Sequence, residues 1–245
     1  RVKSLLRSDL DRKIFSHSFW ILCGNVTSKF ALLLATIVMA RYMGNEEYGQ
    51  FGIIKSTILM FAMFAGLELG MTATKYIAQY LDHDNNKIER IIGLSNLFAI
   101  TLSLIISGAV YFYSAAIAIQ IAAPQLTYEI KISSFILFFS SINGIQTGIL
   151  NGLQRFKEVS LINAFAGILS ALLLILSAIY GNLDTVVLAF GANFIILFLL
   201  NYLVLRKYFY KVFKINIFSV SNFKEIEVLW KFSLPAIFAG MMVGP

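Results

Sequence analysis

Long runs of apolar residues alternate along the chain with short segments in which polar and charged residues gather. A transmembrane helix needs about 20 mainly apolar residues, because each residue rises about 1.5 Å and the hydrocarbon core is about 30 Å thick. Six runs reach this length, and a seventh begins near residue 232. The predicted spans are 17–40, 50–72, 91–114, 131–150, 159–180 and 184–205.

This pattern predicts an all-α fold, a polytopic transmembrane helical bundle with six complete spans and the start of a seventh. The alternating segments of about ten residues that build membrane β-barrels are absent, so helices remain as the way to pair the backbone in lipid. Of the 245 residues 58% are hydrophobic and 13% charged, and the mean hydropathy is +0.78. The chain starts with Arg1 and stops at Pro245 inside an apolar run, so we expect a fragment of a longer protein.

Basic residues predict the orientation and the division of the chain. Most of the 20 Lys and Arg residues precede the first span or follow the second, fourth and sixth spans. Lys and Arg flanking spans stay on the cytoplasmic side, so we expect a protein of the cytoplasmic membrane with a cytoplasmic N-terminus. The predicted parts are a basic arm (1–16), a six-helix lobe (17–205), a basic cytoplasmic linker (206–231) and the start of a second lobe (232–245). This topology and anionic lipids account for the net charge of +7, so no nucleic-acid partner is predicted.

Motifs of enzymatic chemistry are scarce. The chain has no Gly-rich phosphate loop ending in Gly-Lys-Ser/Thr and no His-Glu-x-x-His or Cys-x-x-Cys pattern, so we expect no cofactor, no metal and no enzymatic activity. In Asp82-His83-Asp84 two carboxylates flank one residue, an arrangement that could hold a metal against a nucleotide-sugar diphosphate. That chemistry needs a surrounding nucleotide-binding domain, and the segment 76–90 is too short for one, so we interpret it as a helix connection.

Polar residues inside the first span point to function. Ser18, Asn25, Lys29 and Thr36 fall within about 40° of one another on a helix and form one stripe. A charge at the bilayer centre costs about 2.5 to 3.5 kcal/mol on insertion scales, so Lys29 is expected to face a bundle interior or a water-filled cavity. The alternative is a structural ion pair with Glu68 near the inner end of the second span.

Other polar positions leave two interpretations open. Lys55, in the outer third of the second span, could line the same cavity or extend its ammonium group to the interface. In the fourth span Asn143 lies beside a second polar stripe, and these side chains either line the cavity or pack against another helix. The members of that stripe are Ser133, Ser140, Thr147 and Asn151.

Small residues predict close helix contacts. The fifth span repeats them in register and is expected to pack through Asn163, Gly167, Ser170, Ser177 and Gly181. Gly66 and Gly70 near the end of the second span predict close packing or a bend that acts as a gate.

Four segments together resemble a known family. They are ARYMGNEEYGQFGII (40–54), GLELGMTATKYIAQY (66–80), GILNGLQRFKEVSLIN (148–163) and LWKFSLPAIFAGMM (229–242). In this order, and with six spans, the chain resembles polysaccharide and O-antigen flippases, the Wzx-like members of the multidrug/oligosaccharidyl-lipid/polysaccharide (MOP) exporter superfamily. These proteins have two six-helix lobes around a central cavity, so the resemblance implies a first lobe with the beginning of a second.

The resemblance implies a transporter that flips a polyprenyl-diphosphate-linked oligosaccharide by alternating access, with lysines of the first two spans lining a cationic cavity. It also implies membrane lipids, a coupling ion (proton or sodium) and polysaccharide-assembly proteins as partners. Glu68 departs from a purely cationic lining, and it either pairs with a lysine or takes part in ion coupling. One alternative is a multidrug exporter of the MATE type, which typically carries an acidic residue deep in the first helix, whereas that span here has Lys29 and no carboxylate. The other is a membrane-embedded polysaccharide polymerase or glycosyltransferase.

Overall fold

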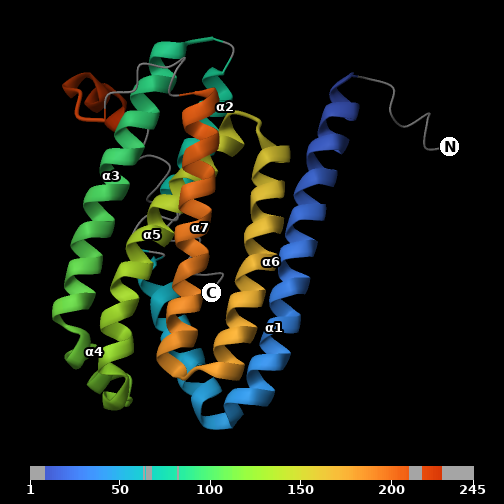
Figure 1. Ribbon diagram of the computed structural model, residues 1–245. Helices are drawn as coiled ribbons and strands as arrows, with labels where there is room; N and C mark the ends of the chain where they lie inside the picture. Colours follow the sequence, from blue (N-terminus) through green and yellow to red (C-terminus); the bar gives the residue numbers. More distant parts are fainter. Residues whose placement is uncertain (1–8, 63, 65–67, 82, 210–216, 228–245) are drawn as a thin grey trace.

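The computed structural model describes residues 9–62, 64, 68–81, 83–209 and 217–227. Within these ranges the chain is helical and has no strand, which confirms the all-α class. The elements are α1 (Asp9–Ala62), α2 (Glu68–Tyr80), α3 (Asn85–Phe112), α4 (Ser114–Gln120), η2 (Pro124–Leu126), α5 (Thr127–Gly152), α6 (Phe156–Tyr180), α7 (Leu183–Tyr208) and η3 (Val220–Glu225), shown in Figure 1. The start of the basic arm, Gly66, the side chain of Glu68 and the predicted seventh span lie outside the described residues.

Helix α1 reverses direction at Gly44. This residue has φ 75° and ψ 175°, a conformation that glycine reaches easily because it has no Cβ atom. Figure 1 shows the blue helix descending from the N-terminal side and the chain turning back upward at the bottom of the bundle. We call residues 9–43 the first arm of α1 and residues 45–62 the second arm.

Five helical stretches of the described chain are long and apolar enough to cross a membrane. The first, Ser18–Ala62, has 45 residues and would measure about 68 Å as a straight helix, more than twice the hydrocarbon thickness. The turn at Gly44 divides it between the predicted spans 17–40 and 50–72. Helix α1 ends at Ala62 and α2 begins at Glu68, so two α-helical segments share the second predicted span.

The predicted spans 131–150, 159–180 and 184–205 lie within α5, α6 and α7, and the span 91–114 lies in α3 except for its last two residues, since α3 ends at Phe112. Two of these helices begin at side-chain caps. The carboxylate of Asp84 accepts a hydrogen bond from the backbone N–H of Lys87 (3.0 Å), and Asn182 and Thr185 form a reciprocal capping box at α7. Asp84 of the Asp-His-Asp segment therefore serves as a helix cap.

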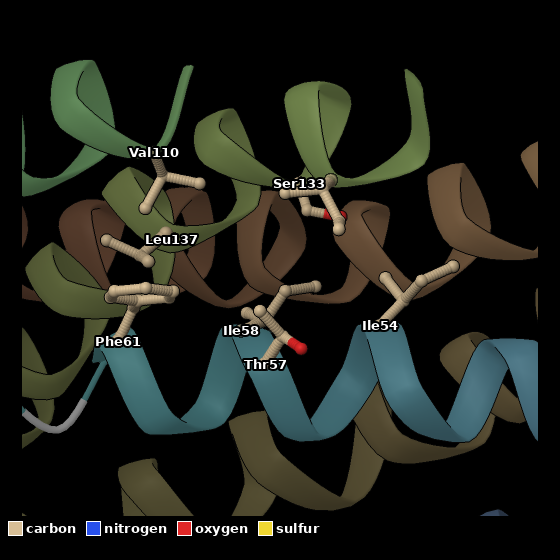
Figure 2. A pocket seen from close by; sticks show the side chains of 8 residues that line it. Ile54, Thr57, Ile58, Phe61, Val110, Ser133 and Leu137 are labelled. Carbon is tan, nitrogen blue, oxygen red and sulfur yellow. The ribbon is translucent and has the colours of Figure 1, made fainter. Parts of the chain in front are cut away.

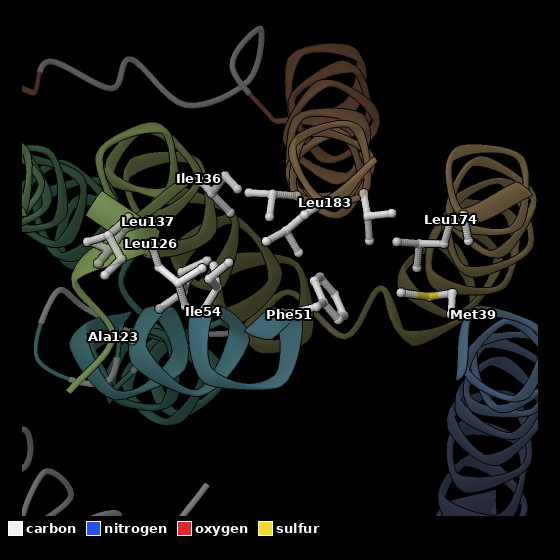
Figure 3. Close-up of a cluster of buried hydrophobic side chains, with 14 of the residues drawn as sticks. Met39, Phe51, Ile54, Ala123, Leu126, Ile136, Leu137, Leu174 and Leu183 are labelled. Atoms are coloured by element: carbon white, nitrogen blue, oxygen red, sulfur yellow. The ribbon is translucent and has the colours of Figure 1, made fainter. Parts of the chain in front are cut away.

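Helix α5 is the central helix of the bundle and contacts every long helix, whereas the first arm of α1 packs mainly along α6. Two apolar clusters fill the space between the helices. Figure 3 shows the first, in which Met39 packs near Leu174 and Ile54 lies against α5. The ring of Phe51 packs edge to face against that of Phe190 on α7. Large apolar side chains such as Phe30 and Leu172 remain exposed on the outside, as expected for surfaces that meet lipid or another lobe.

Small residues set the closest helix contacts. A Cβ atom added at Gly24 on α1 would lie 2.7 Å from the carbonyl oxygen of Ser160, and one added at Gly167 on α6 would overlap Ser28. At the α2–α5 crossing, a Cβ atom on Gly70 would lie 2.6 Å from the carbonyl oxygen of Gly144. Gly167 and Gly70 therefore occupy positions where only glycine permits the helices to approach so closely.

The connections segregate to two ends of the bundle. At the α1-turn end, Tyr42 and Glu47 share a small cleft of about 290 Å³ with Ser177 and Asn182 from the α6–α7 connection. At the opposite end, which we call the linker end, the guanidinium of Arg90 pairs with Glu225 of η3 at 2.9 Å. The segments predicted to lie outside thus meet at one end, and the described part of the predicted linker packs on α3 at the other.

Candidate functional site

The polar stripe of the first span lies on the open side of α1. Gly24 and Ala35 face the bundle and are buried, whereas the stripe residues lie roughly a third of a turn around the helix. All four stripe residues are exposed, namely Ser18, Asn25, Lys29 and Thr36. The charge of Lys29 is therefore not enclosed within the described helix bundle.

The two arms of α1 enclose a cleft beside this open side. Its volume is about 360 Å³, and both apolar and polar side chains line it. The lining residues are Thr36, Met39, Tyr48, Phe51, Gly52, Lys55, Ser56 and Leu59. The structure thus brings together two predicted site residues, Thr36 and Lys55, which stand 19 positions apart in the sequence.

The cleft has an apolar floor and a polar rim. Met39 and Phe51 are 2% and 7% exposed and belong to the first apolar cluster. Lys55 is exposed, and the hydroxyl of Thr36 donates a hydrogen bond to the carbonyl oxygen of Leu32 (2.8 Å). Lys55 is the only charged side chain among the described residues of the lining, and it gives this part of the cleft a positive character.

Six lining residues were not predicted from the sequence, and among them Tyr48, Gly52 and Ser56 are the polar and small residues of the second arm. Together with Lys55 they fall on one face of the second arm, because positions 48, 52, 55, 56 and 59 follow helical periodicity. That periodicity is visible in the sequence. It indicates a shared helix face only once the second arm is known to start at Asn45.

Lys29 lies farther along the same stripe. It precedes Thr36 by seven residues, which corresponds to about 10 Å along a helix axis. Neither Lys29 nor Lys55 forms an ion pair with a carboxylate of the described residues. The alternative pairing of Lys29 with Glu68 stays a prediction, because the Glu68 side chain lies outside the described residues.

The predicted polar lining of the fourth span lies elsewhere, in the contact between α5 and α7. The side-chain amide of Asn201 donates to Asn143 Oδ1 (2.7 Å) and to Thr147 Oγ1 (3.2 Å). Asn201 is 1% exposed and was not predicted, although an asparagine in the middle of an apolar span is itself a signal. This cluster is separate from the cleft between the α1 arms.

A second cavity, between the second arm of α1 and helices α3 and α5, is too small for a substrate. Its volume is about 10 Å³, room for about one water molecule. Figure 2 shows Ile58 and Phe61 of the α1 arm facing Leu137 and Val110 across it. The hydroxyl of Ser133, one of the polar positions of the fourth span, donates to the backbone oxygen of Glu129 (2.6 Å).

The described residues contain no group of three or more His, Cys, Asp or Glu side chains placed to hold a metal ion. The cleft between the two arms of α1, with a cation in its lining, is therefore the candidate site that the described residues offer for an anionic ligand.

Comparisons with known proteins give the family of the chain and the structures that share its fold. The sequence profile of a family described as polysaccharide biosynthesis protein matches residues 14–243. No curated protein sequence matches the chain significantly.

Two solved structures share the fold. One is a MOP superfamily transporter from Pyrococcus furiosus Vc1, described as having a binding pocket of reverse polarity that suggests a different function; it has a TM-score of 0.73 and 18% identity. The other is a multidrug resistance MATE family transporter of the MOP superfamily in an outward-facing conformation, with a TM-score of 0.69 and 18% identity. Each match covers 96% of this chain and 53% of the transporter, so the chain spans about half the length of these proteins.

Proposed function

Because the chain belongs to the polysaccharide biosynthesis protein family, we propose that it forms the first lobe of a transporter that flips a polyprenyl-diphosphate-linked oligosaccharide across the cytoplasmic membrane. The lobe would rock against a second lobe by alternating access, with the open side of α1 facing the transport cavity. The N-terminus would be cytoplasmic. A coupling ion, proton or sodium, and polysaccharide-assembly proteins are further predicted partners.

One observation carries the proposal: Lys55 lies in the lining of a cleft of about 360 Å³, beside the stripe that contains Lys29. A diphosphate is an anion, and two opposite unit charges about 4 Å apart attract by about 4 kcal/mol at an effective dielectric constant of about 20. The apolar floor of the cleft limits hydration and strengthens this attraction. Ser56 and Tyr48 on the rim offer hydroxyl groups that can bond to phosphate or sugar oxygens.

The main alternative is export of cationic drugs. One structural neighbour is described as a multidrug resistance transporter and another as having a pocket of reverse polarity, so we take the charge of the pocket as the discriminating feature. The described lining of the cleft carries a lysine and no carboxylate. A cationic drug would be repelled there, whereas a diphosphate would be attracted.

The test is a flipping assay with the full-length protein in proteoliposomes and a fluorescent polyprenyl-diphosphate oligosaccharide. We expect Lys55→Ala to slow the initial flipping rate about tenfold or more, because a hydrogen bond to a charged group contributes about 1.5 to 3 kcal/mol. Lys55→Arg is expected to keep part of the rate, since the charge survives while its geometry changes. Lys87→Ala is the matched control, because Lys87 lies over the Tyr80 ring, outside the cleft.

Three outcomes would contradict the proposal. The first is an unchanged flipping rate in both Lys55→Ala and Lys29→Ala proteins. The second is export of an organic cation by the wild-type protein in place of the lipid-linked sugar. The third is elongation or cleavage of the glycan, which would identify a membrane-embedded polymerase or glycosyltransferase.

A further inference from the structure

An apolar groove runs between α3 and α5 on the surface of the bundle, near the end where α3 finishes and α5 starts. Its volume is about 410 Å³, and its walls are formed largely by Leu104, Gly108, Tyr111, Phe135, Phe138 and Phe139. None of its lining residues belongs to the cleft between the α1 arms. A ligand of the groove would therefore be separate from a ligand of the cleft.

The groove offers almost no free hydrogen-bonding groups. Both serine hydroxyl groups of the lining are engaged with the backbone: Ser107 donates to the carbonyl oxygen of Ser134, and the Ser134 hydroxyl donates to that of Lys131 (2.8 Å). The phenol of Tyr111 is the other hydroxyl group among the described lining residues. Water in such a space would lack the two to four polar partners it needs, so the groove suits a hydrocarbon chain.

The ammonium group of a lysine lies beside the groove, over one of its lining rings. The ammonium group of Lys131 lies 4.6 Å from the centre of the Tyr111 ring, and that ring packs edge to face against Phe135. No carboxylate of the described residues pairs with Lys131. Glu129, the nearest acidic residue along α5, is about 200° away around the helix and so lies on the opposite face. Within the described part of the chain, the ammonium group thus faces an aromatic ring and has no counter-ion.

We infer that this groove binds an anionic phospholipid, with one acyl chain between α3 and α5 and the headgroup phosphate at Lys131. The combination of an apolar channel and a single cation at its interfacial end matches the chemistry of such a lipid. We assign the site to a bilayer lipid because it shares no lining residue with the cleft proposed for the transported substrate. On the predicted topology this end faces the outer leaflet.

Two variants of the full-length protein test the two halves of the site. Lys131→Gln removes the charge, and Gly108→Leu fills the groove, since a Cβ atom at Gly108 meets no other atom within 4 Å. The controls are Lys157→Gln and Ala109→Leu. Lys157 also lies over an aromatic ring, 5.0 Å from the centre of Trp20, and Ala109 is exposed on α3 beside the groove without lining it.

The measurements are the amount of phosphatidylglycerol that copurifies and the thermal midpoint in nanodiscs with and without phosphatidylglycerol. We expect Lys131→Gln to weaken phosphatidylglycerol binding about fivefold, equivalent to about 1 kcal/mol for one basic residue at an anionic surface. Gly108→Leu is expected to abolish the rise in the midpoint that this lipid produces in the wild type. Both controls should retain the lipid and the rise.

Unchanged lipid retention in Lys131→Gln would overturn the inference, even if Gly108→Leu failed to fold. It would also be overturned if an isoprenyl diphosphate displaced phosphatidylglycerol from the wild type and bound Gly108→Leu more weakly, since the groove would then hold the tail of the cargo. Neither lipid retention nor the thermal midpoint depends on transport. A protein that failed the flipping assay would therefore still show whether phosphatidylglycerol binds in the groove.

Discussion

At the scale of single residues, position decides what an intramembrane lysine can do. Lys29 is exposed on the first arm of α1, and Lys55 lies in the cleft on the second arm. A lysine buried within the lobe would need a partner, because an isolated buried charge costs several kcal/mol. A lysine on an open face that meets a second lobe can instead remain hydrated and available for an anionic substrate.

This distinction predicts the outcome of a double-mutant cycle between Lys29 and Glu68. We expect Lys29→Ala to reduce glycan export about tenfold while the amount of protein in the membrane stays normal, because no buried carboxylate loses its partner. Glu68→Gln should not restore export in the double variant. The measurements are surface glycan in a complementation assay and quantified membrane protein.

The structural ion pair gives the opposite pattern. Each single neutralisation would leave an unpaired charge in the membrane and lower protein abundance, and the double variant would recover it. Recovery of abundance in the double variant, together with normal export, would rule out a cavity role for Lys29.

At the scale of elements, close backbone contacts hold the helices of this lobe together. In lipid there is little hydrophobic gain when two apolar helices meet, so packing and hydrogen bonds between helices carry the association. At the α2–α5 crossing the hydroxyl of Thr74 donates to the backbone oxygen of Gly148 (3.0 Å). This hydrogen bond is possible because the backbones of the two helices approach closely at Gly70.

We therefore predict that Gly70→Ala destabilises the lobe by about 1 to 3 kcal/mol, the usual cost of overpacking. The added Cβ atom would lie 2.6 Å from the carbonyl oxygen of Gly144, and both helices would have to separate. The thermal midpoint in detergent measures the effect. Gly108→Ala is the control: its Cβ atom meets nothing, so the midpoint should stay or rise slightly, because alanine favours helix more than glycine. Equal midpoints for the two variants would refute close packing as the role of Gly70.

At the scale of the whole molecule, the segregation of connections to two ends matches the distribution of basic residues. The turn at Gly44, the segment at Pro124 and the α6–α7 connection belong to the α1-turn end, whereas Arg90 and η3 meet at the linker end. One surface of the lobe should thus face outside the cell and the other the cytoplasm.

Cysteine labelling tests this orientation. In a background where Cys23, the single cysteine of the chain, is replaced by serine, we expect Gln125→Cys to react with an impermeant reagent in intact cells. Ser221→Cys on η3 should react only after permeabilisation. Both positions are exposed, so access to the reagent depends on the side of the membrane. Labelling of Ser221→Cys in intact cells would reverse the predicted topology.

The sequence by itself determined the helical class, most of the span positions and the grouping of connections. These features follow from local physics, because lipid forces the backbone into helices and flanking charges stay with the cytoplasm. The prediction was weakest for 50–72, where hydropathy does not reveal that α1 ends at Ala62 and α2 begins at Glu68. The polar stripe on the first span was also predictable, since helical periodicity depends only on spacing.

Only the tertiary structure decided which residues meet. In a membrane, a face that packs and a face that touches lipid are equally apolar, so periodicity does not tell one from the other. The turn at Gly44 brings Thr36 to Lys55, and the α5–α7 contact gives Asn143 and Thr147 a partner in Asn201. These contacts join segments far apart in the chain, and their geometry depends on how closely whole helices approach, which no local pattern contains.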